Sequence, residues 1–199
     1  IITTLVANGS LINKRLAKEI ISSGLDAVSF SLNSLVPEIH NKTRGIDTSF
    51  DDVMLAIENL WERERLRLTI STTVMRENIN DLIGLVEFVK SNILDGINFQ
   101  PLMETSIYPI FNKEGKTDKF PGGKLYQELG KNMENVDDVF NQLISMKKEG
   151  YPINNSVKQL RYTAKYLKNR TDLEILGVKC KIGSKNLFID PFGNVRLCM

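Results

Sequence analysis

The sequence predicts an α/β fold built on a partial, open parallel β/α barrel, followed by helices and a C-terminal β-hairpin. Three observations support this prediction. Short runs rich in β-branched residues alternate with amphipathic helical stretches over the first hundred residues, Gly or capping residues separate several of these units, and no low-complexity segment interrupts them. Strand–helix alternation of this kind produces a parallel sheet with right-handed crossovers. A chain of 199 residues can bury the core that such a sheet needs.

Four strands and three helices are predicted in this first part. The strands cover 1–8, 25–33, 66–74 and 96–102. The first helix covers 13–23 and ends at Gly24, a residue suited to a helix C-terminus. The other two are indicated by apolar stripes at helical spacing: Phe50, Val53, Met54, Ile57, Leu60 and Trp61 after a cap at Thr48 or Ser49, and Ile79, Leu82, Ile83, Val86 and Val89. We expect Phe50 and Trp61 to lie in the core.

The second half has a different pattern. Residues 108–136 are rich in Gly, Lys and Asn and predict a loop or linker. Two helices follow, one carrying Val139, Phe140, Leu143 and Ile144 and ending at Gly150, the other carrying Val157, Leu160, Ala164 and Leu167. A hairpin with a turn at Pro191 and Gly193 ends the chain. The predicted units are 1–107, 108–176 and 177–199.

The predicted strands carry polar residues on one face. Buried parallel strands are usually apolar throughout, but here apolar and polar positions alternate. One face gathers uncharged hydrogen-bonding residues, namely Ser29, Ser31, Asn33, Thr69, Ser71, Thr73, Asn98 and Gln100. A wet cavity or a polar ligand at the strand carboxyl ends would satisfy these groups. The alternative is a face exposed to bulk solvent, which usually carries Lys and Glu instead.

The composition excludes several classes of protein. A net charge of +2 without blocks of like charge gives no electrostatic footprint for nucleic acid, and no apolar run approaches a membrane span. Two cysteines are too few for a secreted disulfide scaffold of this size. We therefore expect a cytoplasmic protein with no nucleic-acid or membrane partner.

Four stretches resemble the third to sixth strands of radical S-adenosylmethionine (SAM) enzymes. They are "LVANGSLI", "AVSFSLNSLVPEIHNKTRG", "STTVMRENINDL" and "INFQPLM", in order and at the spacing of that family. The most specific stretch runs from Ser29 to Gly45. The sequence departs from the family pattern at Ala7, where Thr is usual, and at Asn33, where Asp is common. Both departures leave the polar face of the sheet in place but weaken individual contacts.

The C-terminus resembles the start of the SPASM or twitch extension of certain radical SAM enzymes. Twelve residues separate Cys180 from Gly193, and four more separate Gly193 from Cys198. In the family, such cysteines hold an auxiliary four-iron four-sulfur cluster, and thiolates are the usual ligands of such clusters. The resemblance implies that Cys180 and Cys198 are metal ligands. A disulfide or two free thiols would also fit the composition.

The resemblance also implies contacts to SAM. The implied residues are Asn8, Ser29, Ser31, Asn33, Arg44, Asn78, Gln100 and Leu102. Asn8 would lie near the methionyl end, the residues of the second strand would serve the carboxylate or ribose, and Arg44 would pair with the carboxylate. Asn78 would reach the ribose, and 100–102 would border the adenine. Arg44 as a surface loop residue and Asn78 as a helix cap are the alternatives, and we predict that the single histidine, His40, is a loop or helix-entry residue.

The implied function is that of a radical SAM iron–sulfur oxidoreductase acting on a peptide, protein or cofactor precursor. SAM would be cleaved to a 5′-deoxyadenosyl radical that abstracts hydrogen from the substrate. The three-cysteine C-x3-C-x2-C loop of the family is absent, so we expect a fragment that is inactive alone and binds neither SAM nor a cluster. Its first strand would be an exposed sheet edge prone to self-association. A scaffold half-barrel, or an ordinary metabolic barrel enzyme, are the alternatives.

Overall fold

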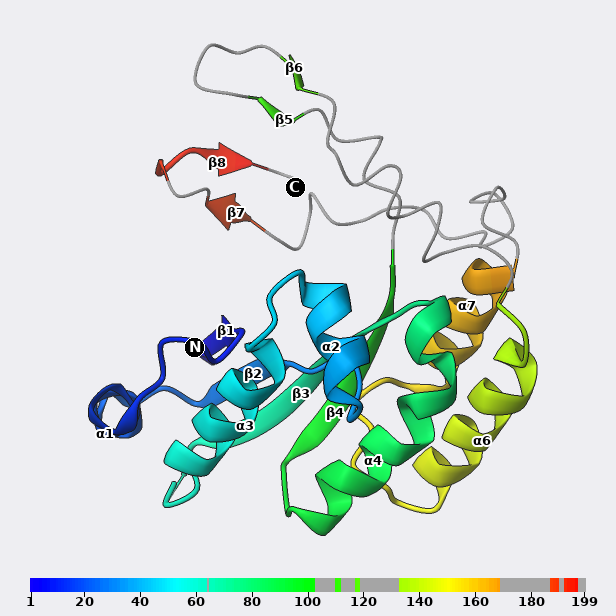
Figure 1. Cartoon of the computed structure of the whole chain (residues 1–199), viewed down its shortest axis with the longest axis horizontal. Coiled ribbons are helices and arrows are strands. Elements are labelled where there is room, and N and C mark those ends of the chain that lie inside the picture. Colours follow the sequence, from blue (N-terminus) through cyan, green and yellow to red (C-terminus); the bar gives the residue numbers. More distant parts are fainter. Residues whose placement is uncertain are drawn as a thin grey trace.

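A computed structural model describes seven segments of the chain: 1–63, 65–102, 110–111, 117–118, 133–168, 187–189 and 192–196. Its centre is a four-stranded parallel sheet with the strand order β1-β2-β3-β4 (Figure 1). The strands are β1 (Thr4–Ala7), β2 (Ala27–Ser31), β3 (Arg67–Val74) and β4 (Gly96–Pro101). The predicted open parallel β/α arrangement is thus confirmed.

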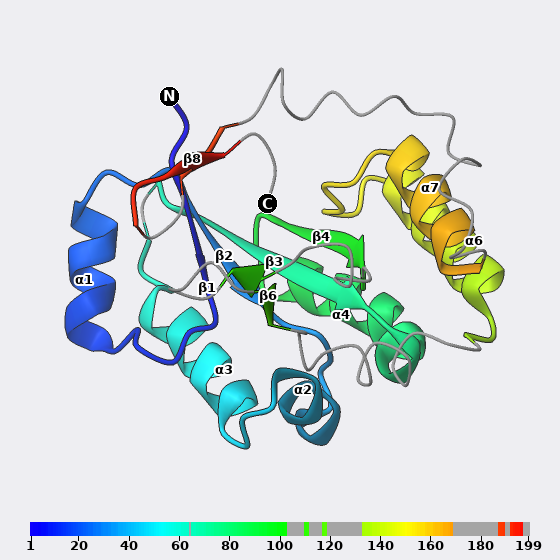
Figure 2. The same cartoon turned by 90° about the horizontal axis from the view of Figure 1, so that it is seen from above.

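Helices cover one face of this sheet. In the view from above, α1, α3, α2 and α4 follow one another along that face, and α6 and α7 lie beyond β4 (Figure 2). Their bounds are α1 Lys14–Ser22, α2 Pro37–Arg44, α3 Ser49–Asn59, the 3₁₀ helix η1 Arg76–Asp81, α4 Leu82–Ser91, α6 Val136–Lys148 and α7 Val157–Lys168. Sequential strands joined by such crossovers give the neighbour order seen here.

Helix α2 is an element that the sequence analysis missed. Its signals are local: Pro37 occupies the first turn, Glu38 follows it, and Gly45 ends the helix at φ 70°. Proline suits the first helical turn, and glycine adopts the left-handed conformation of a C-terminal cap without strain. Helix α2 contains both His40 and Arg44. His40 lies in its first turn, in agreement with the helix-entry form of the prediction, whereas the surface-loop alternative for Arg44 was wrong.

Two pairs of very short antiparallel strands complete the described structure. Strands β5 (Ile110–Phe111) and β6 (Thr117–Asp118) pair inside the stretch that was predicted to be a loop. Strands β7 (Phe188–Ile189) and β8 (Val195–Arg196) form the predicted C-terminal hairpin, and Gly193 between them has φ 83°. Cys180 and Cys198, which flank this hairpin in the sequence, lie outside the described residues.

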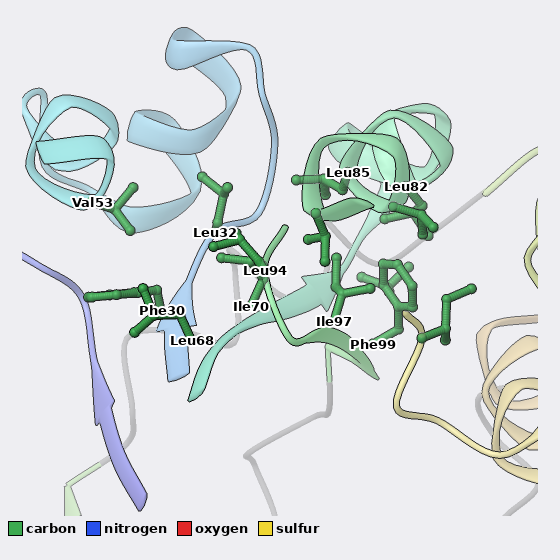
Figure 3. Close-up of a cluster of buried hydrophobic side chains, with 14 of the residues drawn as sticks. Phe30, Leu32, Val53, Leu68, Ile70, Leu82, Leu85, Leu94, Ile97 and Phe99 are labelled. Carbon is green, nitrogen blue, oxygen red and sulfur yellow. The ribbon is translucent and has the colours of Figure 1, made fainter. Parts of the chain in front are cut away.

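The core lies between the sheet and the helices. Alternate strand positions point into it, and Figure 3 shows Phe30, Leu32 and Ile70 among the side chains that pack there. Thr72 also lies on this face and is buried, and its hydroxyl donates to Leu32 O at 2.7 Å. Trp61 is the exception among the predicted core residues, because 47% of its surface is exposed. It follows the end of α3 and lies on the outside of the molecule.

The β4 edge of the sheet is closed by the chain after α6. Ile97 N–H donates to Pro152 O, and Asn154 N–H donates to Ile97 O, so this segment runs alongside β4 like a short parallel strand. The side chain of Asn155 then continues the ladder: its Oδ1 accepts from Phe99 N–H at 2.7 Å and its Nδ2 donates to Phe99 O at 3.0 Å. One amide side chain therefore replaces the next backbone pairing.

The β1 edge, by contrast, is uncovered in the described part of the chain. Thr4, Leu5 and Val6 are exposed, and Val6 has 68% of its surface accessible. On its outer side β1 has no strand neighbour among the described residues. An apolar edge with unpaired backbone groups is a template for pairing with another chain.

We predict that the chain self-associates through β1, and that Val6→Lys suppresses this association because a charged edge strand resists pairing. Light scattering over a range of protein concentrations measures the effect. Leu11→Lys is the matched control, since Leu11 is also highly exposed but lies outside the strand. A monomer at every concentration, or equal effects of the two variants, would contradict the prediction.

Candidate functional site

The face of the sheet turned away from the helices carries the predicted polar wall. The parallel register aligns these residues in rows across the strands. Ser31 pairs with Ser71, and Ser71 pairs with Asn98, while Thr73 pairs with Gln100 one step nearer the carboxyl ends. Most of these side chains are partly exposed, in contrast to the buried apolar positions between them. The wall is therefore continuous over three strands and open to a ligand.

The hydroxyls of Ser29 and Ser31 are available on this wall. Neither hydroxyl has a hydrogen-bond partner among the described residues, although Ser29 is largely buried and Ser31 is half-buried. Farther along the wall, Gln100 Nε2 donates to Ser71 Oγ at 3.3 Å, a long contact. Neither oxygen is among the buried side-chain atoms that lack a partner, so both hydroxyls keep contact with solvent and can hydrogen-bond a polar ligand on this face.

Asn33 and Asn78 are placed together at the ends of β2 and β3, but their polar atoms are already used. Asn78 is fully buried, its Nδ2 donates to Asn33 O at 2.7 Å and to Thr73 O at 2.9 Å, and its Oδ1 accepts from Met75 N–H. Asn33 Oδ1 accepts from Thr73 N–H at 3.1 Å, and Asn33 Nδ2 donates to Thr43 Oγ1 at 3.1 Å. These two amides join β2, β3 and α2. The helix-cap alternative for Asn78 agrees with this geometry, because its side chain accepts from the backbone amide of Met75, the N-cap residue of η1.

His40 belongs to the same buried network. Its Nδ1 accepts from Asn33 N–H at 3.1 Å, which places the proton on Nε2, and Nε2 donates to Ser49 Oγ at 3.2 Å. Burial, with the positive charge of Arg44 nearby, lowers the pKa of His40 from 6.5 to about 4. The ring is therefore neutral at pH 7, and it fixes α2 and α3 against the end of β2.

Arg44 occupies the last turn of α2 and is half-buried. In the part of the chain that the structure describes, it has no ion pair or hydrogen bond, and the hydrogen bond between its neighbour Thr43 and Asn33 holds this turn beside the end of β2. A guanidinium without a partner among the described residues, in a helix turn beside the end of β2, is suited to an anionic group, above all a carboxylate.

The remaining predicted site residues lie at the ends of the outer strands. Asn8 Oδ1 accepts from Ser10 N–H at 3.1 Å and from Ser10 Oγ at 3.0 Å, so this side chain shapes the turn after β1. Leu102 is half-buried just after β4, and its backbone amide donates to Val74 O at 3.0 Å. Ser29 and Ser31 share the wall with Gln100, whereas Asn8 and Leu102 mark its two borders.

Sequence reasoning treated Ser71, Thr73 and Asn98 as wall residues without selecting them as contacts. The signal that would have selected them is the register, because Ser71 lies directly between Ser31 and Asn98. In the described residues there is no group of three or more His, Cys, Asp or Glu side chains that would hold a metal ion. Among the described helices, none has the length and apolar character needed to cross a bilayer.

Comparison with known proteins shows what the first part of the chain is similar to. A sequence model of the Radical SAM superfamily matches residues 1–89. The Fe-coproporphyrin III synthase of Methanosarcina barkeri is 27% identical over 96 residues, which are 48% of this chain and 24% of that protein. The probable GTP 3′,8-cyclase of Methanocaldococcus jannaschii is 34% identical over 128 residues, with coverage of 58% of this chain and 41% of that protein. The chain thus spans less than half the length of either relative.

Solved structures share the fold at low sequence identity. Native anSMEcpe with bound AdoMet and Kp18Cys peptide matches with a TM-score of 0.55 and 20% identity, covering 100% of this chain and 51% of that one. Streptococcus suis SuiB bound to precursor peptide SuiA matches with a TM-score of 0.53 and 18% identity, covering 77% of this chain and 31% of that one. The likeness extends the shared fold beyond residues 1–89.

The lowered pKa of His40 predicts a pH dependence of stability. As the pH falls below 6.5, the unfolded chain binds a proton that the folded ring does not accept until about pH 4, so the free energy of unfolding decreases through this window. Because Arg44 is partly exposed and its charge is screened, we expect a loss of roughly 1–2 kcal/mol between about pH 7 and about pH 5.

Urea unfolding of the chain and of His40→Gln at both pH values measures this loss. The glutamine variant retains a donor and an acceptor but does not titrate, so its stability should change less over the same window. Equal pH dependence in the two proteins would contradict the assignment of a neutral, buried imidazole.

Proposed function

Because residues 1–89 belong to the radical SAM superfamily, we propose that this chain supplies the SAM-binding wall of a larger radical SAM oxidoreductase. The observation that carries the proposal is the uncharged polar face of the sheet, whose serine hydroxyls have no partner among the described residues. SAM offers two ribose hydroxyls, an amino acid zwitterion and an adenine, which match such a face. In this family the bound cofactors supply a radical that removes a hydrogen atom from the substrate.

The proposed role of each residue follows from its position at the sheet and from the hydrogen-bonding groups that it offers. Ser29 and Ser31 would hydrogen-bond the ribose or the carboxylate of SAM, and Arg44 would pair with the carboxylate. Asn8 would border the methionyl end, and Gln100 with Leu102 would border the adenine. These positions lie at or next to the carboxyl ends of parallel strands, where open α/β sheets bind their ligands.

Asn33 and Asn78 act differently in this proposal. Their amide groups are committed to strand ends and to α2, so they would hold the wall in shape rather than contact SAM. In Asn78 three hydrogen bonds use both amide hydrogens and the oxygen, which leaves little capacity for a ligand. Replacing either residue should therefore reduce the stability of the wall before it affects recognition.

The chain does not supply the ligands of the activating cluster. It has two cysteines and no C-x3-C-x2-C loop, so the sites for that cluster must come from other residues of the parent protein. We propose that Cys180 and Cys198 are ligands of an auxiliary four-iron cluster that further thiolates complete. The chain alone would then be inactive and would bind neither SAM nor a cluster.

The proposed substrate is a peptide, a protein or a cofactor precursor. The anSMEcpe structure contains a peptide, SuiB is bound to its precursor peptide, and the curated relatives are named as a coproporphyrin synthase and a GTP cyclase. These names support both kinds of substrate. The cytoplasm remains the predicted compartment.

The wall is tested in the parent enzyme with the double variant Ser29→Val/Ser31→Val. Valine suits a strand, so the fold should be kept, while the loss of two hydrogen bonds at about 1 kcal/mol each should weaken SAM binding by roughly tenfold or more. Equilibrium dialysis with SAM and the yield of 5′-deoxyadenosine measure this loss. Thr4→Val is the control, because Thr4 is a hydroxyl residue at the amino end of β1 and is not among the residues proposed to contact SAM. Unchanged SAM binding and cleavage in the double variant would exclude the wall as the SAM-binding surface.

The cysteines are tested separately. In this chain both thiols should react with a thiol reagent after unfolding without reductant, and the protein should lack absorbance near about 400 nm. A longer form containing further cysteines, reconstituted with iron and sulfide without oxygen, should gain that absorbance. Cys180→Ala/Cys198→Ala should remove the absorbance of the auxiliary cluster. A disulfide between Cys180 and Cys198 in the anaerobic parent protein would refute cluster ligation.

A further inference from the structure

A hollow of about 540 Å³ lies between α3 and α4, on the outside of the molecule. Its lining is mainly apolar and is contributed by Met54, Leu55, Ile57, Trp61 and Phe88. The charged residues of the lining, Asp51 and Glu58, are both acidic and both exposed. We call this surface the α3–α4 groove. It is separate from the polar wall, because α3 and α4 cover the opposite face of the sheet (Figure 2).

The groove exposes large apolar side chains that the core does not use. Leu55 is 53% exposed, although it belongs to the helix that packs Val53 and Ile57 into the core, and Trp61, just after the end of that helix, is 47% exposed. A single exposed leucine is ordinary, but a tryptophan and a leucine that border one hollow form a contiguous patch. Such patches mark interaction sites, and tryptophan is among the residues that contribute most to binding energy at interfaces.

Trp61 is held in place before any partner arrives. The guanidinium of Arg63 lies 5.7 Å from the centre of the Trp61 ring. Arg63 also donates to Ile93 O at 2.8 Å and lies 3.4 Å from Asp95 Oδ2, so its position is fixed by the loop before β4. Cation–π contact of this kind restrains the indole, and a restrained anchor loses less conformational entropy on binding than a mobile one.

The charge of the groove determines the kind of partner. Asp51 lies four residues before Leu55 along α3 and Glu58 lies three residues after it, so both are on the same side of the helix as this apolar residue. Glu62 extends the acidic character next to Trp61, although the adjoining hollow between α1 and α3 also contains Lys14 and Lys18. Negative charge around an apolar floor repels nucleic acid and anionic membranes, and it favours lysine and arginine.

We propose that the α3–α4 groove binds a basic amphipathic helix of a partner protein. An apolar side chain of that helix would pack on Trp61 and Leu55, and its lysine or arginine residues would pair with Asp51 and Glu58. A hollow between two helices accepts a third helix through the same ridge-and-groove packing that joins helices within a protein. The polar wall stays open when this partner is bound.

The test uses Trp61 as an intrinsic probe, because it is the single tryptophan of the chain. The full chain is titrated with a synthetic helical peptide of about 18 residues, made of leucine at helical spacing and lysine elsewhere. Packing of a leucine on the exposed indole should shift Trp61 emission to shorter wavelength and protect it from acrylamide quenching. A peptide with glutamate in place of lysine should bind at least tenfold more weakly.

Two pairs of variants distinguish binding in the groove from nonspecific binding of the peptide. Leu55→Ser should weaken binding of the lysine peptide at least tenfold, whereas Leu11→Ser, at another highly exposed leucine, should leave it unchanged. Glu58→Lys should reverse the preference between the two peptides, whereas Glu19→Lys, in the second half of α1, should not. Both lysine substitutions lie in the C-terminal half of a helix, where a positive charge suits the helix dipole.

Several outcomes would overturn the proposal. These are an unchanged Trp61 spectrum with the lysine peptide, equal responses to both peptides, and equal binding by Leu55→Ser and the unaltered chain. A blue shift that grows with protein concentration alone would assign the groove to a second copy of the chain. A blue shift with vesicles of anionic lipid would assign it to a membrane surface, and either result would refute a basic helix as the occupant.

Discussion

The sheet is buried on one face only, and this asymmetry governs the rest of the described structure. Every second residue of β2, β3 and β4 packs against the helices, so a change of register by one residue would place serine and threonine in the core and leucine and isoleucine on the open face. The burial of Phe30, Ile70 and Ile97 therefore fixes the position of every polar residue on the wall. The hydrophobic effect on one face thereby determines which side chains the other face presents.

The ends of the strands require a second device, because β2 and β3 must leave the sheet toward different helices. Backbone groups at such ends lose their ladder partners, and buried groups without partners are costly. The side chains of Asn33, His40 and Asn78 take over this function, and each bonds to backbone of another element. Asn155 repeats the solution at the β4 edge, where its amide bonds both groups of Phe99. Amides suit these places because one side chain offers both a donor and an acceptor.

The sequence was sufficient to predict the strands, the helices with long apolar stripes and the polar wall, because these follow from periodicity. It was insufficient for α2, whose eight residues contain too few apolar positions for a stripe and are specified by Pro37 and Gly45 instead. Composition also could not separate Ser31 from Asn33, since both lie on one strand face. Their difference depends on Thr43 and Thr73, which come from α2 and β3 and approach Asn33 only after folding.

Trp61 illustrates a further limit of periodicity. It continues the apolar stripe of α3 by spacing, but the helix ends at Asn59, so the spacing no longer determines where its side chain points. The chain turns there toward β3, and Arg63 holds the indole on the outside of the molecule.

The two exposed surfaces, the polar wall and the α3–α4 groove, differ in chemistry. The wall lacks charge and offers hydroxyls, which suits a small polar ligand, whereas the α3–α4 groove combines apolar area with acidic groups, which suits a basic helix. Since the sheet and its core separate these surfaces, the proposed partner in the groove would leave the proposed ligand site on the wall accessible.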